Sequence, residues 1–349
     1  MAEPIGPTDR GPGYFPLLTE GKLESYFHRP RSLVAEVDTF GFAFKVSGDV
    51  DLVGATITAS VEAGTGEVHF DRARRSLKSG LTLSTGVGGK AWVEGSLPKA
   101  ATGSNVEALR WSEAVEVARA GYDEACEFVE PEHTGKVFEL STIVRLDPVR
   151  DFDDVAHVPE LLDGLAGVQR TGSMKVRRFA DVERNRAESL RVGPKSWADS
   201  IYDKHAETKG EAAPGRLRTE GRFHGEQLSS AWAGDGGFLM RQVVDVSEEK
   251  VALLRRASFE RVGFDREVVG MSTAQTKIAE CESLDLREKC GFWTFLTAPL
   301  IFEGSPPTLR KYRRLAAEMG IEVGSAVADG HPVLIRLDYE SGREVARVA

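Results

Sequence analysis

The sequence contains little cysteine and no long apolar run. Its three cysteines, Cys126, Cys281 and Cys290, are an odd number at wide spacing, which excludes a disulfide framework and a CxxC metal knuckle. No stretch approaches the roughly 18 apolar residues of a membrane-spanning helix. The first residues lack the basic and apolar segments of a signal peptide. We therefore expect a cytoplasmic protein with reduced thiols and no membrane contact.

Three catalytic signatures are also missing. The chain has no HExxH zinc motif, no GxSxG nucleophile elbow and no Walker A motif. The stretch GVGGK at 86–90 has no Ser or Thr after its lysine, so it predicts a hairpin turn. The histidines are scattered and no His-hydrophobe-His pair occurs. We expect His69, His205 and His224 at the surface or behind the ligands of a site, rather than as metal ligands.

An excess of positive charge is lacking as well. The 349 residues include 45 Lys and Arg against 54 Asp and Glu, a formal net charge of -9. This argues against a protein that coats nucleic acid by bulk attraction. Residues 170–195 nevertheless hold eight basic and three acidic side chains, and four basic residues surround Tyr312. These clusters are either solvated faces or a DNA-contacting strip and a helix that enters a major groove.

The spacing of apolar residues predicts an α+β protein. Period-two alternation dominates 32–224 and is interrupted by helical spacing at 111–126 and 155–167. This order predicts a largely antiparallel sheet with helices on one face. Three of the individual strands that we expect are 136–147, 197–204 and 216–224.

A different pattern follows residue 225. Helical spacing at 238–262, 272–290 and 305–320 precedes a strand at 331–338. This predicts a mostly helical C-terminal region. We expect a flexible leader at 1–30, a first domain at 31–230, and a mainly helical domain at 231–349 with a helix-turn-helix.

Four of the expected strands carry polar side chains on one face. In 216–224 these are Arg216, Arg218, Glu220, Arg222 and His224. Equivalent sets on the other strands are Ser200, Tyr202 and Lys204; Glu139, Arg145 and Asp147; and Trp92, Glu94 and Ser96. Such a face is either a solvated surface laced with cross-strand ion pairs or a surface that binds phosphate.

The second interpretation would supply the parts of a phosphoryl-transfer site. A free tyrosine has a pKa of about 10, and the neighbouring Lys204 or a divalent cation would favour the phenolate of Tyr202. Arg218 and Arg222 could clamp the phosphate. A tyrosine two residues before a lysine is also common as a purely structural residue.

Acidic residues on the same strands suit a hard divalent cation. Mg²⁺ or Mn²⁺ prefers oxygen ligands, which Asp147 could supply together with Glu94 or Glu139. The cation would polarise a phosphodiester oxygen and orient the phosphate for in-line attack.

Four segments then occur in a recognisable order. They are WVEGSLPKAATGSNVEAL (92–109), VRLDPVRDF (144–152), SIYDKHAETKG (200–210) and GRLRTEGRF (215–223). Together they resemble the motifs of the replication initiators of rolling-circle plasmids and filamentous phages, over about residues 30–230. The segment 295–321 is also similar to the C-terminal part of such proteins. The ordered set is more specific than any single motif.

The resemblance implies a metal-dependent DNA nickase in the domain at 31–230. In that family a tyrosine attacks one strand at an origin, retains the 5′ end and frees a 3′-OH primer. Tyr202 would be the nucleophile, Lys204 its electrostatic partner and Glu207 the acidic residue of the motif. Mg²⁺ or Mn²⁺ would be held by Asp147, Glu94 and Glu220.

The implied contacts with phosphate and DNA are basic. They are Arg218, Arg222, Lys99, Arg177, Arg178, Lys311 and Arg314. The implied partners are origin DNA, single-stranded or cruciform, together with a host helicase and a second copy of the chain.

Two features leave alternatives open. Many relatives carry a His-hydrophobe-His motif on a central strand, and here only His69 stands in the corresponding VHFD segment, so carboxylates would have to replace it. The nucleophile could also lie elsewhere, for example at Tyr122. The main rival function is a non-catalytic DNA-binding regulator of replication or copy number with the same fold. The basic cluster at 170–195 disfavours a carboxylate-pair hydrolase.

Overall fold

The computed structural model describes most of the chain between residues 35 and 348. The described residues are 35–47, 54–62, 64–65, 67–86, 89–132, 138–156, 158–167, 174–181, 186–193, 197–225, 228, 242–266, 268–297, 304–319, 321, 326–327 and 333–348. The predicted leader at 1–30 and residues 298–303 lie outside them. Among the described residues, no helix is long and apolar enough to cross a membrane.

The predicted α+β architecture is confirmed. Most strands belong to one large antiparallel sheet, and helices occur throughout and toward the C-terminus. By contacts, the chain divides into two compact units. Unit 1 comprises residues 1–148 and 222–257, and unit 2 comprises residues 149–221 and 258–349. The strands β7 (Thr142–Phe152) and β11 (Leu217–His224) contribute residues to both.

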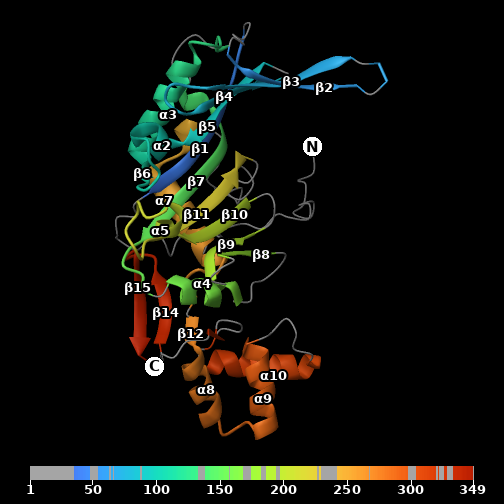
Figure 1. Cartoon of the computed structure of the whole chain (residues 1–349), viewed down its shortest axis with the longest axis vertical. Helices are drawn as coiled ribbons and strands as arrows, with labels where there is room; N and C mark the ends of the chain where they lie inside the picture. The colour runs from blue at the N-terminus through green and yellow to red at the C-terminus, as the bar shows by residue number, and fades with distance from the viewer. Residues whose placement is uncertain are drawn as a thin grey trace, which may run out of the picture. The chain divides into compact units, whose positions relative to one another are not determined.

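Unit 1 is a sheet covered by helices on one face. Its strands follow the order β2-β3-β4-β5-β1-β7. Their bounds are β1 Glu36–Lys45, β2 Thr56–Val61, β3 Val68–Ser76, β4 Thr82–Gly86, β5 Lys90–Ser96 and β6 Leu109–Arg110. The helices α2 (Leu97–Thr102) and α3 (Trp111–Ala125) pack against β1 and β5 (Figure 1).

Alternating aromatic residues build the core of unit 1. Phe40, Phe42 and Phe44 of β1 are all buried, and Phe42 and Phe44 contact Tyr122 of α3. The helix approaches the sheet closely at Gly121, where an added Cβ would lie 2.4 Å from a methyl carbon of Leu81. The period-two pattern of β1 thus places its aromatic rings beneath the amphipathic helix that the sequence predicts.

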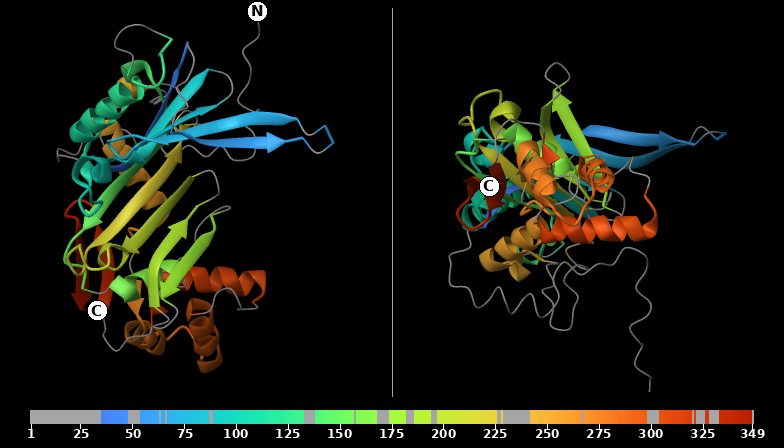
Figure 2. Two further views of the ribbon diagram at one scale, coloured as in Figure 1. Left: turned by 45° about the horizontal axis from the view of Figure 1, so that its top comes forward. Right: turned by 90° about the horizontal axis from the view of Figure 1, so that it is seen from below.

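Unit 2 contains the rest of the large sheet and a smaller one. In the large sheet β11 is followed by β10 (Trp197–Asp203), β9 (Arg186–Val192) and β8 (Val176–Asp181). The helix α4 (Val158–Gly167) lies against β8, β9 and β10 (Figure 2). The small sheet has the order β13-β12-β14-β15, with bounds Ala326–Val327, Val268–Gly270, Val333–Asp338 and Arg343–Val348.

The predicted helical C-terminal region is also confirmed. Its helices are α7 Glu248–Arg261, α8 Met271–Glu280, α9 Leu286–Thr297 and α10 Pro306–Glu318. The expected strand at 331–338 corresponds to β14, but its partners β12 and β15, and β13 beyond β12, were not expected. Ser305 caps α10 by accepting a hydrogen bond from the backbone of Thr308, as the Ser-Pro-Pro start predicts.

Two element boundaries differ from those expected. The strand predicted at 136–147 begins only at Thr142, because Phe138–Leu140 forms a 3₁₀ turn that directs Phe138 into the aromatic core. The helix predicted at 272–290 is two helices. Asp285 and Glu288 cap each other's backbone N–H groups at the start of α9, a capping box that starts a new helix.

Candidate functional site

Tyr202 lies at the end of β10, on the face of the sheet opposite the unit 2 core. Its neighbour Ile201 is fully buried, whereas Tyr202 is half-buried. The Tyr202 hydroxyl donates a hydrogen bond of 3.2 Å to Oε2 of Glu220 on β11. The strand stops one residue later because the Asp203 side chain accepts from the backbone of Ala206 and starts the short helix α5 (Lys204–Glu207). Tyr202 therefore faces a carboxylate that can accept its proton.

The sequence interpretation expected Lys204 to continue the polar face of the strand, but the structure differs. Lys204 is the first residue of α5, and it is fully buried. Its ammonium group lies 2.8 Å from Oε2 of Glu207 and 5.7 Å from the centre of the Tyr202 ring. The sequence brings Tyr202, Lys204 and Glu207 together correctly, but the helical turn places the cation beneath the tyrosine ring rather than beside its hydroxyl.

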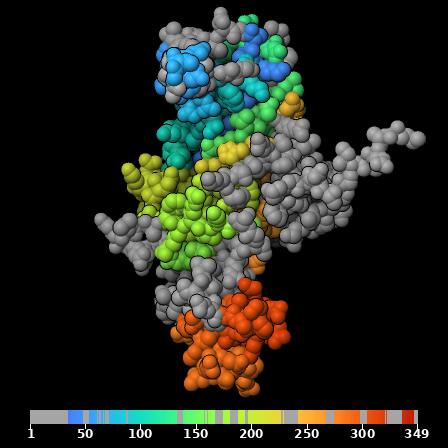
Figure 3. Space-filling model, turned by 90° about the vertical axis from the view of Figure 1, so that its right-hand side faces the viewer, coloured from blue at the N-terminus to red at the C-terminus, as the bar shows by residue number. Residues whose placement is uncertain are grey.

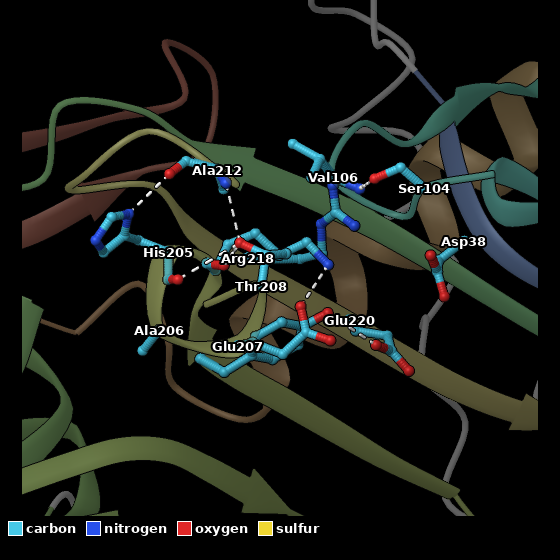
Figure 4. A network of polar contacts seen from close by, with 12 residues as sticks. Asp38, Ser104, Val106, His205, Ala206, Glu207, Thr208, Ala212, Arg218 and Glu220 are labelled. Atoms are coloured by element: carbon cyan, nitrogen blue, oxygen red, sulfur yellow. Dashed lines mark hydrogen bonds and ion pairs between the residues drawn. The ribbon is translucent and has the colours of Figure 1, made fainter. Parts of the chain in front are cut away.

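The segment after Tyr202 is held by its own hydrogen bonds. Thr208 Oγ1 donates to the carbonyl of Lys204 at 2.7 Å and accepts from the backbone of Ala212 at 3.0 Å. A ring nitrogen of His205 lies 2.7 Å from the Ala212 carbonyl (Figure 4). His205 thus contacts the backbone of the loop that follows α5.

Cross-strand register places basic and aromatic side chains on the same face as Tyr202. Tyr202 pairs with Ser189 on β9, which pairs with Phe179 on β8. The adjacent row on that face is Ser200, Arg191 and Arg177. Directly opposed residues of an antiparallel pair share a face. We call these six residues the open face of unit 2.

Two features of the open face suit a polyanion. Arg177 and Arg191 stand directly opposite each other, an arrangement that is unfavourable without an anion between them. Within the described residues, neither guanidinium has an ion pair or hydrogen bond. The Phe179 residue beside them is 53% exposed. The sequence interpretation included Arg177 and Arg191 in the basic cluster at 170–195 but missed Phe179. Only the strand register shows that these residues neighbour Tyr202.

Arg178, also predicted to contact DNA, lies on the other face. It pairs with the buried Leu190 across the strands, and its guanidinium lies 2.6 Å from Asp163 of α4. The two consecutive arginines thus have different surroundings, because alternation along β8 directs one to the open face and the other toward the helix.

Arg218 is not on the surface as a phosphate clamp requires. It is fully buried, and it donates two hydrogen bonds of 2.6 and 2.7 Å to the carboxylate of Asp151. Arg222 is 38% exposed, with its Nε 3.5 Å from Asp147. Four other residues of β11 follow the predicted alternation and are buried: Leu217, Thr219, Gly221 and Phe223.

In unit 1, the predicted carboxylates are engaged by arginine. The Arg145 guanidinium hydrogen-bonds both oxygens of Asp147, which is fully buried, and lies 2.7 Å from Glu94. Burial opposes the charge of Arg145, but the bonds to Asp147 and Glu94 hold the pKa of its guanidinium above its ordinary value. An added Cβ at Gly41 would lie 3.2 Å from both Arg145 and Glu94. The sheet therefore shows here the cross-strand ion pairs of the first interpretation.

The residues predicted to hold a metal do not form a cation site. Among the described residues, no group of three or more His, Cys, Asp or Glu side chains is placed to hold a metal ion. Asp147 and Glu94 share Arg145, Glu220 accepts from Tyr202, and the alternative ligand Glu139 pairs with Arg119 at 2.7 Å. We therefore derive no chemical step through a metal.

Lys99 is the other expected DNA contact in unit 1. It is exposed in the last turn of α2. Its side chain is therefore accessible for the predicted contact with DNA.

Two further expected DNA contacts lie on α10. Lys311 pairs with Glu288 at 2.6 Å, and Arg314 lies 3.5 Å from Glu318. Between them, Tyr312 is buried and donates a hydrogen bond to the Glu288 carbonyl. The basic cluster of α10 is therefore partly neutralised by local acids.

Tyr122, the alternative nucleophile, is buried in the aromatic core. Its exposed fraction is 7%, and burial raises the pKa of its hydroxyl. A buried phenol that resists deprotonation is poorly suited to attack a phosphodiester. Of the two tyrosines considered from the sequence, Tyr202 has the accessible hydroxyl and a proton acceptor.

Comparisons with known proteins find a loose structural likeness. No family model matches the chain, and no curated protein matches it. Among solved structures, the chain is similar to a rolling circle replication initiator protein from Geobacillus stearothermophilus. The match has a TM-score of 0.34 and 12% identity, and it covers 84% of this chain and 99% of that one. A TM-score of this size describes a loose match, and the function proposed below rests on the residues of this chain.

Proposed function

We propose that the chain initiates rolling-circle DNA replication by nicking one strand of an origin through Tyr202. The observation that carries this proposal is the position of Tyr202. Its hydroxyl contacts the Glu220 carboxylate on a face that also bears Arg177, Arg191 and the exposed Phe179. The ordered motifs of the sequence support the same function.

The nicking step balances without any further reactant. The Tyr202 oxygen attacks the phosphorus while its proton passes to the Glu220 carboxylate. A bond forms between the tyrosine oxygen and phosphorus, and the bond from phosphorus to the 3′-oxygen breaks. The departing 3′-oxygen takes up the proton that Glu220 received, so the step gains and loses no proton overall. The products are a 5′-phosphotyrosyl linkage and a free 3′-OH.

The surroundings of Tyr202 have distinct roles in this proposal. Arg177 and Arg191 hold the phosphates of the bound strand, and Phe179 offers a ring on which a base can stack. Lys204 and Glu207 keep the tyrosine in position from beneath. We retain Arg222, Lys99, Lys311 and Arg314 as proposed DNA contacts, and assign Arg178 and Arg218 supporting positions.

The proposed substrate is origin DNA presented as a single strand or cruciform. Single-stranded bases can reach the aromatic ring of an open sheet face, whereas stacked and paired bases cannot. A requirement for Mg²⁺ or Mn²⁺, a helicase partner and a homodimer remain implications of the family resemblance. The nicking assay is therefore run with each cation and with a chelator.

A non-catalytic regulator is the second candidate. The pairing of Lys204 with Glu207 and of Arg218 with Asp151 is also what a protein without chemistry would use to stabilise the same strands. The two functions differ in whether a DNA strand is cut. Binding without cutting under every cation condition would favour the regulator.

Substitution of Tyr202 separates these functions. Purified protein should convert a supercoiled plasmid carrying its own origin to the nicked form, and Tyr202→Phe should abolish nicking while leaving DNA affinity within about twofold. Tyr339→Phe is the matched control, because Tyr339 is another half-buried tyrosine of unit 2, and it should nick like the unmodified protein. Nicking by Tyr202→Phe would refute the assignment of the nucleophile.

A further inference from the structure

Unit 1 has a groove of its own on the sheet face opposite α3. Its volume is about 440 Å³, within the range of pockets that hold small organic ligands. The side chains that decide its chemistry are Arg72, Arg74, Trp92, Glu94 and Arg145. Trp92 alternates with Val93, whose side chain lies near Gly121 of α3, so the indole lies on the face away from the helix.

Strand register leaves the indole ring at the floor of this groove. Trp92 stands between Ser84 on β4 and Ala43 on β1 in one cross-strand row. These small neighbours do not rise beside the ring, so a flat ligand can lie against it. Arg72 lies over the ring, with its guanidinium carbon 5.7 Å from the centroid. This distance is near the roughly 6 Å limit of such contacts. The contact between Arg72 and the ring is therefore weak, and an incoming aromatic group can displace it.

The charge of the groove is positive. Arg74 continues the Trp92 row, and Arg72 continues the adjacent row that leads to Lys90 and Lys45. Within the described residues, neither Arg72 nor Arg74 forms an ion pair or hydrogen bond. Glu94 is the one acid among the described residues that line the groove, and it lies 2.7 Å from Arg145. In the part of the chain that the structure describes, the two strand arginines therefore have no counter-charge and stand beside an aromatic ring.

We propose that this groove is a second binding site, for one or two nucleotides of a single nucleic-acid strand. A base stacks on Trp92 and its phosphates contact Arg72 and Arg74. Stacking needs an unpaired base, so duplex DNA does not fill the site. The groove lies in unit 1 and the proposed nucleophile in unit 2, and binding here requires no nicking.

The β2–β3 hairpin continues the sheet beyond the groove. Residues 72–76 of β3 pair with β4, whereas residues 68–70 pair only with β2 among the described strands. The hairpin projects from the other strands of unit 1 (Figure 1), and Figure 3 shows it end-on in light blue. A strand that leaves the groove past Arg72 therefore runs along an exposed ribbon of the same unit.

Tryptophan fluorescence and oligonucleotide affinity test the site. Addition of a short oligo(dT) to the full chain should quench its fluorescence, and Trp92→Phe should remove that part of the quenching. Trp92→Ala should raise the Kd about 5- to 140-fold, the factor that corresponds to stacking of about 1–3 kcal/mol per base. Trp92→Phe should stay within about fivefold, because it retains a ring. Circular dichroism of each variant checks that it is folded.

Charge variants and other ligands complete the test. Arg72→Ala combined with Arg74→Ala should reduce the slope of log Kd against log salt by about 1.4, since each phosphate contact contributes about 0.7 for a single strand. Lys78→Ala, which removes an exposed charge outside the groove, should leave the slope unchanged. Thymidine monophosphate and duplex DNA should bind at least tenfold more weakly than oligo(dT).

Three results would overturn the proposal. They are unchanged oligo(dT) affinity in folded Trp92→Ala, an equal loss in Lys78→Ala, and binding of monophosphate or duplex as tight as that of oligo(dT). Tyr202→Phe should bind oligo(dT) normally. A failure of nicking and a failure of this site are therefore distinguishable.

Discussion

At the scale of single residues, the buried charges are held by matched partners. Arg218 has no exposed surface, and Asp151 meets it with both carboxylate oxygens. Such a pair contributes little net stability when intact, because both ions lose their hydration. Loss of one partner is costly, since the other ion remains buried with less compensation of its charge.

Removal of the Asp151 charge should therefore destabilise the protein strongly. We expect Asp151→Asn to lower the free energy of unfolding by about 3–5 kcal/mol. Asp153→Asn is the control: its carboxylate is 56% exposed and pairs with Arg216 at 2.8 Å, so its loss should cost at most about 1 kcal/mol. Urea unfolding of both variants measures the difference. Equal costs would contradict a structural role for the Arg218 pair.

The two consecutive arginines of β8 give a second prediction. Arg177 lies on the open face of unit 2, whereas Arg178 points toward Asp163 of α4. Arg177→Ala should weaken single-strand binding and reduce the salt slope by about 0.7, whereas Arg178→Ala should leave the slope unchanged. Fluorescence anisotropy at several salt concentrations measures both. A larger slope change in Arg178→Ala than in Arg177→Ala would indicate that DNA contacts the opposite face of β8, and it would contradict this prediction.

The sequence predicts individual residues unevenly. Alternation correctly groups Tyr202 with polar neighbours, and it predicts the buried series from Leu217 to Phe223. It fails at Lys204, because Asp203 ends the strand and the turn of α5 carries the lysine inward. It also fails at Arg218. The partner Asp151 lies on a strand that is far away in the sequence, so the spacing of residues along β11 does not reveal it.

At the scale of elements, a carboxylate joins helix α3 to the turn after β3. Glu124 accepts hydrogen bonds from the backbone N–H groups of Lys78 and Ser79, the latter at 3.0 Å. Burial opposes the charge, but these two backbone donors hold the pKa of Glu124 below its ordinary value. The contact fixes the β3–β4 turn against the helix that covers the core of unit 1.

This contact should make part of the stability depend on pH. A carboxylate with a lowered folded-state pKa stabilises the protein above its unfolded pKa of about 4.3. That stability is lost as the pH falls through the folded pKa. Glu124→Gln should cost about 1 kcal/mol at pH 7, and the difference should vanish in strong acid. Thermal unfolding from pH 7 to pH 3 measures it, and a difference that grows toward low pH would contradict it.

The elements themselves are largely predictable, but not all of their ends are. Period-two and helical spacing correctly give β10, β11, α3 and α4. The late start of β7 at Thr142 depends on Phe138 packing against Phe42 and Tyr122, which is a tertiary contact. The division between α8 and α9, by contrast, has a local signal in Asp285 and Glu288.

At the scale of the whole molecule, charge position matters more than the net charge of -9. Acids concentrate on helices such as α3 and at the start of α7, where Glu248 and Glu249 stand. Each unit nevertheless carries arginines on a sheet face that form no ion pair with any described residue, Arg72 and Arg74 in one and Arg177 and Arg191 in the other. Such a chain should bind DNA at these two sheet faces and release it as the salt concentration rises.

Identification of the residue that becomes linked to DNA tests the central claim most directly. The protein is incubated with a single-stranded origin oligonucleotide, then treated with nuclease and trypsin, and the adduct is located by peptide mass. The proposed function predicts a nucleotide on the tryptic peptide 196–204, attached through Tyr202, and no adduct in Tyr202→Phe. An adduct on another peptide, or nicking that leaves no covalent linkage, would contradict it.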